Sequence, residues 1–83
     1  MMWKYTIQVN GMMCGMCESH VNDAVRKAFP VKKVTSSRGR NETTVFAETE
    51  LDEESLCAAI SAAGYDAAGI RKEHWEKRRL FGR

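Results

Sequence analysis

The sequence of 83 residues contains a single proline, Pro30, and lacks any run of about 18 apolar residues. The missing apolar run excludes a membrane-spanning helix. The N-terminal segment M-M-W-K-Y-T-I-Q-V alternates too early and is too polar for a secretory signal. We therefore expect a cytoplasmic protein, and the length predicts one domain with a thin hydrophobic core.

Cysteine is scarce, and the count of three is odd. Secreted domains of this size that depend on disulfides usually carry an even and larger number. Cys14 and Cys17 lie close together, whereas Cys57 is forty residues further along the chain. In a reducing compartment, such a close pair indicates metal binding or redox chemistry. We expect Cys57 to be a small, partly buried side chain, with a third metal ligand or a redox partner as the alternative.

Net positive charge is absent before residue 71, because residues 1–70 sum to −2. The net charge is +2, yet residues 71–83 hold six Lys or Arg against two Glu. A nucleic-acid-binding domain usually carries its positive charge on the folded face, so no nucleic-acid partner is expected. The distribution predicts a domain at 1–72 and a basic tail at 73–83. This tail is expected to be mobile, and the alternatives are docking on the body, on an acidic membrane surface or on a partner.

The first half of the chain shows two clear periodicities. Alternating apolar residues predict a strand at 3–9 with one buried face. Apolar residues at spacings of three and four predict a helix at 15–29, which Pro30 ends. The residues expected to face the core are Trp3, Tyr5, Ile7 and Val9 in the strand and Cys17, Val21, Ala24, Val25 and Ala28 in the helix.

The second half repeats the pattern with an added hairpin. Two short strands are predicted at 31–37 and 43–49, joined by the turn R-G-R-N in which Gly39 and Asn41 accept positive φ. A second helix is predicted at 53–63, and a short last strand at 65–70. The helix is expected to have Asp52 as its N-cap and Leu51 and Leu56 as its hydrophobic staple. Gly64 is expected to be the glycine that ends the helix. The residues expected to form the buried stripe of the helix are Leu56, Ala59, Ile60 and Ala63.

The order strand, helix, strand, strand, helix, strand predicts a ferredoxin-like, split βαβ fold of the α+β class. It has one four-stranded antiparallel sheet with both helices on one face. The fold brings the end of the first strand, the start of the first helix, the R-G-R-N turn and Tyr65 to the same end of the sheet. Cys14 and Cys17 are therefore expected on an exposed loop that enters a helix N-terminus, where thiolates are stabilised.

The residues around the cysteine pair favour metal over disulfide chemistry. No proline lies between the two cysteines, Gly11-Met12 rather than a tryptophan-containing redox sequence leads into them, and no second proline offers a cis-Pro loop. Gly11 permits a tight turn after the strand. Met12 is expected to be buried and to anchor the loop to the core.

The segment G-M-M-C-G-M-C after a strand, then V-x-x-A-V, then A-x-x-x-A-G-Y-D, resembles the heavy-metal-associated domain family over roughly residues 3–71. That family includes copper chaperones, modules of copper-transporting P-type ATPases and mercury-binding proteins. The resemblance implies that Cys14 and Cys17 are metal ligands, that Met12 is the core anchor, and that Tyr65 lies beside the metal. The supporting residues of the site are then Gly11, Met12, Met13, Met16 and Tyr65.

The donor set indicates the metal. Two thiolates suit Cu(I), whereas a structural zinc site requires four ligands. Met13 and Met16 depart from the residues common in the family, and the uncharged Met13 favours Cu(I) or Ag(I), with Hg(II) and Zn(II) as alternatives. The thioethers of Met13 and Met16 either add sulfur donors to the metal site or form a contact surface for a partner. His20 leans towards the site but is expected to be an exposed surface histidine.

The predicted function is that of a Cu(I) chaperone, which makes and breaks no substrate bond and is not an enzyme. The resemblance implies that it passes one ion to the metal-binding domain of a copper-transporting P-type ATPase. The alternatives are a thiol-disulfide oxidoreductase that uses the same cysteines and a mercury or silver detoxification module. An exposed dithiol also permits a homodimer bridged by metal.

Overall fold

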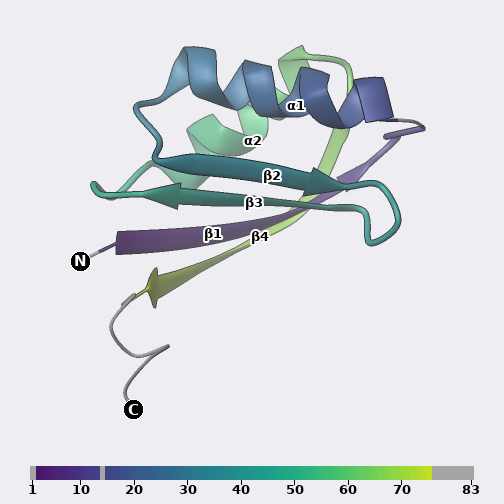
Figure 1. Cartoon of the computed structure of the whole chain (residues 1–83). Helices are drawn as coiled ribbons and strands as arrows, with labels where there is room; N and C mark the ends of the chain where they lie inside the picture. The colour runs from purple at the N-terminus through teal and green to yellow at the C-terminus, as the bar shows by residue number, and fades with distance from the viewer. Residues whose placement is uncertain (1, 14, 76–83) are drawn as a thin grey trace.

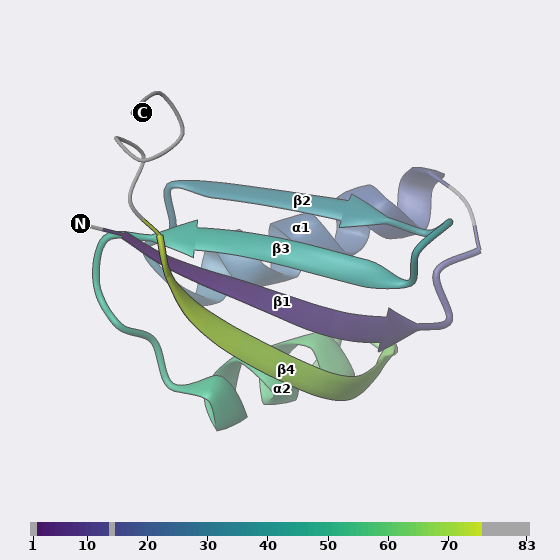
Figure 2. The same cartoon turned by 90° about the horizontal axis from the view of Figure 1, so that it is seen from below.

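The computed structural model describes residues 2–13 and 15–75. Its four strands form one antiparallel sheet in the order β2-β3-β1-β4, and both helices cover the same face of that sheet (Figures 1 and 2). The predicted split βαβ fold is therefore confirmed. The elements are β1 (Met2–Asn10), α1 (Gly15–Ala28), β2 (Lys33–Ser37), β3 (Glu42–Ala47), α2 (Glu53–Ala62) and β4 (Asp66–Trp75).

Strand β1 runs through the middle of the molecule and pairs with both β3 and β4. Its alternation is as predicted: Tyr5, Ile7 and Val9 are fully buried, and Trp3 is half-buried against the core. The helices complete the core from above with two pairs of residues at helical spacing. These pairs are Val21 and Val25 on α1 and Leu56 and Ile60 on α2.

Two details of the first helix differ from the prediction. Ala28 is exposed, while Phe29, just after the helix, packs against the core. The helix ends one residue earlier than expected, although the Phe29 N–H still donates to Val25 O at 3.0 Å. Pro30 prevents continuation, so the chain turns at Phe29 and brings its ring onto the core.

Strand β4 is longer than predicted. It was expected to end at residue 70, yet its pairing with β1 continues to Trp75, opposite Met2. The sequence does not indicate this part of the strand, because residues 71–74 are polar and exposed. Lys72 lies over the Trp3 ring at 5.2 Å from the centroid, and the His74 ring lies 4.2 Å from it. Glu73, His74 and Trp75 are thus strand residues, and 76–83 lie outside the described residues.

The turns that connect the elements largely follow the expected chemistry. Asn41 takes a positive φ of 56°, whereas Gly39 does not. The carbonyl of Asn41 accepts a hydrogen bond of 2.8 Å from the Val9 N–H, which ties the hairpin to β1. The side chain of Asp52 caps α2 by accepting from the Ser55 N–H at 2.9 Å, as predicted.

A buried hydroxyl fixes the segment that leads into α2. The Tyr5 hydroxyl donates to Leu51 O at 2.9 Å and accepts from Leu51 N at 2.6 Å. Both Leu51 and Leu56 belong to the buried core, at the positions expected of a hydrophobic staple. The entry of α2 is therefore held by packing and by hydrogen bonds together.

Candidate metal centre

The loop between β1 and α1 presents methionine sulfur at the surface above a buried methionine. Gly11 leaves the strand with a φ of 101°, a conformation that only glycine adopts without strain. Met12 is 6% exposed and lies in the core, as expected of an anchor. Met13 and Met16 are each 82% exposed. Side chains of this size are seldom so exposed, so this segment is an exposed apolar surface.

Cys17 lies in the first turn of α1, half-buried against the core. This turn is the positive end of the helix dipole. Cys14 lies outside the described residues, so its place beside Cys17 and its role as a ligand stay predictions. The structure thus places one of the two predicted ligands at a helix N-terminus, at the end of the sheet where the sequence predicted it.

Tyr65 is brought to this loop by the way α2 ends. Gly64, with a φ of 100°, donates its N–H to Ser61 O at 3.0 Å, and Tyr65 N–H donates to Ile60 O at 3.3 Å. These two bonds form a Schellman cap, which turns the chain sharply after the helix. The Tyr65 ring then lies against Gly11, since a Cβ placed on that glycine would be 3.8 Å from ring atom Cδ1.

His20 is exposed, as expected, but it also contacts Tyr65. Its Nδ1 lies 3.2 Å from the Tyr65 hydroxyl, and the two rings meet edge to face at 5.7 Å. The sequence analysis did not find this pair, because the residues are forty-five positions apart and neither carries a local signal for the contact. Tyr65 therefore spans from the beginning of the loop to the second turn of α1.

A second pair at this end was not found from the sequence. Arg38, in the turn between β2 and β3, donates its backbone N–H to Glu18 Oε2 at 2.7 Å. Its Nη1 lies 3.7 Å from Glu18 Oε1. The same guanidinium lies beside Gly15, where an added Cβ would be 3.7 Å from Nη1. The sequence predicted only that the R-G-R-N turn lies at the same end of the sheet as the start of α1. It did not indicate which residue of the turn contacts the helix.

The sulfur groups near the start of α1 suit a soft metal. In the described segments 2–13 and 15–75, no three His, Cys, Asp or Glu side chains gather closely enough to hold a metal ion. The sulfur donors of this segment are the thiols of the C-x-x-C pair and the exposed thioethers of Met13 and Met16. Thiolate and thioether ligands select ions such as Cu(I).

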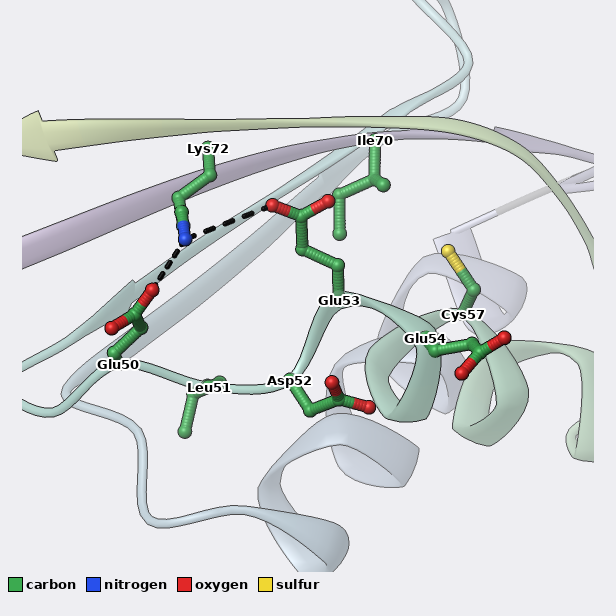
Figure 3. A pocket seen from close by; sticks show the side chains of 8 residues that line it. All are labelled: Glu50, Leu51, Asp52, Glu53, Glu54, Cys57, Ile70 and Lys72. Carbon is green, nitrogen blue, oxygen red and sulfur yellow. Dashed lines mark hydrogen bonds and ion pairs between the residues drawn. The ribbon is translucent and has the colours of Figure 1, made fainter.

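Cys57 lies in a different part of the molecule. It lines an open groove of about 750 Å³ between the start of α2 and β4, together with acidic residues and Lys72 (Figure 3). Burial raises the pKa of the Cys57 thiol, and the negative charge of Glu53 raises it further. The expected small, partly buried thiol is confirmed, and none of the residues that line the groove belongs to the loop between β1 and α1.

Neither helix within the described part of the chain has the length and apolar character needed to cross a membrane.

Comparisons with known proteins agree with this geometry, although no family model matches the sequence. The chain is 32% identical over 68 residues to the copper chaperone CopZ of Enterococcus hirae, covering 81% of this chain and 99% of that protein. It is 34% identical over 69 residues to a mercuric reductase of Lysinibacillus sphaericus, covering 83% of this chain but only 12% of that protein. A solved copper-binding domain from HMA7, a P-type ATPase, superposes with a TM-score of 0.70 at 25% identity, covering 87% of this chain and 95% of that domain.

Proposed function

The chain belongs to the heavy-metal-associated domain family, and from this premise we propose that it is a Cu(I) chaperone. In this proposal Cys14 and Cys17 hold one ion between two thiolates. The observation that carries it is the position of Cys17 in the first turn of α1, directly after the loop that the buried Met12 anchors. The similarity to a copper chaperone along almost its whole length supports the metal.

Transfer proceeds by ligand exchange. An ion held by two thiolates keeps open coordination positions, so a thiolate of a partner binds before one of the original thiolates leaves. The exposed Met13 and Met16 give the partner an apolar contact surface beside the ion. No substrate bond is made or broken, so the proposed function is binding and transfer rather than catalysis. The exchange requires reduced thiols, which fits the cytoplasm.

The proposed recipient is the metal-binding domain of a copper-transporting P-type ATPase. The likeness of this chain to the copper-binding domain of HMA7 supports this choice, since two similar folds present similar loops to each other. Transfer between such domains requires that both dithiol loops are exposed at the same time. A dimer bridged by metal uses the same exposed loop and is the competing assembly.

Delivery of mercury is the second candidate. It is favoured by the match to the mercuric reductase, of which the chain spans only 12%. Hg(II) also accepts two thiolates, so the ligands are shared and only the ion and the partner differ. The activity of the reductase as a whole is not proposed for this chain.

Anaerobic titration with Cu(I) against a competing chelator tests the proposal. We expect one tightly bound equivalent, its loss in the Cys14→Ser/Cys17→Ser variant, and its retention in Cys57→Ser. Native mass spectrometry of the same samples reports the stoichiometry and any dimer. Preference for Zn(II) over Cu(I) in this titration would overturn the proposal. Reduction of insulin disulfides at a rate comparable to thioredoxin would favour the oxidoreductase instead.

A further inference from the structure

The net charge of the complex between the two thiolates and the bound ion depends on which ion is bound. Two thiolates with Cu(I) carry a net charge of −1, whereas the same thiolates with Hg(II) are neutral. A fixed positive charge beside the site repels a divalent ion about twice as strongly as a monovalent one, and a fixed negative charge attracts it about twice as strongly. Charged side chains next to the dithiol therefore influence which ion it prefers.

Arg38 is the cation beside the first turn of α1. Its Nη1 would lie 3.7 Å from a Cβ on Gly15, the residue that follows Cys14 and precedes Met16 and Cys17. The turn that carries Arg38 lies at the same end of the molecule as the start of α1 (Figure 1). The guanidinium therefore approaches the backbone between the two predicted ligands from a separate element.

Glu18 is the anion that opposes it. It follows Cys17 directly, and its Oε1 lies 3.7 Å from Arg38 Nη1. Its Oε2 accepts the Arg38 backbone N–H at 2.7 Å, a bond that does not involve the guanidinium. The carboxylate is thus held in place by the backbone of the turn whether or not the side chain of residue 38 is charged.

Other polar side chains at this end have contacts of their own. Asp66 Oδ2 accepts from the Asn10 side chain at 3.2 Å, and His20 contacts Tyr65. Arg40 lines a groove with Thr6 and Gln8 on the sheet. Among the described residues, Arg38 and Glu18 form an ion pair at the first turn of α1, where the guanidinium also approaches Gly15.

We propose that Arg38 and Glu18 determine the preference of the dithiol for a monovalent or a divalent soft ion. Arg38 shifts the preference towards Cu(I), and Glu18 shifts it towards Hg(II). This inference rests on the proposed function, because it assumes that Cys14 and Cys17 hold the ion. The side chains are 51% and 25% exposed, so water screens their charges and the expected changes are modest.

The experiment measures the affinities for Cu(I) and Hg(II) in competition with an excess of a small dithiol, under anaerobic conditions. Arg38→Gln is expected to lower the ratio of Cu(I) to Hg(II) affinity about threefold, and Glu18→Gln to raise it about threefold. The double variant returns near the wild-type ratio. Arg38→Lys keeps the charge and is expected to keep the ratio. Raising the salt concentration shrinks both shifts, because exposed charges are screened.

Arg40→Gln is the matched control, since it removes the same charge from the same turn. It is expected to change the ratio by less than Arg38→Gln. If only loss of the ion pair mattered, Arg38→Gln and Glu18→Gln would change the ratio in the same direction, and that outcome would overturn the inference. Unchanged ratios in both variants would overturn it as well. If the wild-type protein fails to bind Cu(I) through Cys14 and Cys17, the proposed function fails first, and the titration of the wild type distinguishes the two failures.

Discussion

The two helices begin in different ways, and the difference separates binding from stability. The first turn of α1 carries Cys17, with Met13 and Met16 exposed around it. The start of α2 is closed: Asp52 caps it, and Leu51 before it is buried and hydrogen-bonded to Tyr5. Two βαβ halves of one fold thus use the same structural position for opposite purposes.

Cys17 and Cys57, the two cysteines that the structure describes, also differ in their surroundings. Cys17 lies at the positive end of a helix, where Glu18 is paired with Arg38. Cys57 lies two residues further into its helix, and its pKa is raised by burial and by Glu53. The neutral thiol is thus favoured in the groove, whereas Cys17 lies at the positive end of a helix dipole. A thiolate is the form that binds metal.

The largest expected effect is on Cu(I) affinity, and it tests the difference between Cys17 and Cys57. Replacing Cys17 with Ser removes one of two proposed ligands and is expected to abolish tight Cu(I) binding. Replacing Cys57 with Ser is expected to leave the Cu(I) affinity within about twofold, because the groove does not include residues of the loop. Competition with a Cu(I) chelator measures both. Equal losses in the two variants would contradict this difference.

The second effect falls on stability alone. Tyr5→Phe removes a buried hydroxyl and leaves both the N–H and the carbonyl of Leu51 without their partner. We expect a loss of about 1–3 kcal/mol in the free energy of unfolding. Denaturation by urea, with and without Cu(I), measures it. A matched change at the loop, Met13→Ser, is expected to leave stability within about 0.5 kcal/mol.

The third effect is smaller and tests the closed start of α2. Asp52→Ala removes the side chain that accepts from the Ser55 N–H and hydroxyl. A lost N-cap costs about 1 kcal/mol, and for a domain of this size about 4–8 °C in Tm. Thermal unfolding followed by circular dichroism measures it, with Asp52→Asn as the control that keeps a cap. A changed Cu(I) affinity in Asp52→Ala would show that the two helix starts are coupled.

The smallest effect concerns pH. Since the pKa of Cys57 is raised, its alkylation by iodoacetamide is expected to begin at higher pH than that of an ordinary thiol. In the pH range between the unfolded and folded pKa values, the unfolded chain has lost this proton and the folded protein keeps it. Stability therefore falls as pH rises above about 8.5. Glu53→Gln removes one cause and is expected to move alkylation to lower pH; an unchanged profile would contradict the assignment.

The sequence predicted the elements wherever one face is apolar. Strand β1 and the entry of α2 follow alternation and capping signals that act locally. The second half of β4 was missed because Lys72 and His74, which lie against Trp3, are polar and exposed. Periodicity cannot distinguish a polar side chain that covers an aromatic ring from one that is fully solvated.

Only those parts of the site that depend on local sequence signals were predicted. Gly11 and Met12 belong to a local motif, and their positive φ and burial follow from it. The contact of His20 with Tyr65 depends on how elements pack, and no spacing in the sequence reports it. The predicted topology placed Tyr65 near the loop between β1 and α1. Its contact with His20 depends on side-chain packing, which the topology does not determine.

The pairing of Met2 with Trp75 has a practical consequence. Both residues lie at the end of the sheet opposite to the loop between β1 and α1 (Figure 2). A tether to a solid support, joined before Met2 or after Trp75, therefore leaves from the far side of the domain. A protein immobilised at either of these two positions presents the loop between β1 and α1 to a partner in solution, so the proposed transfer can be tested on a surface without redesign of the fold.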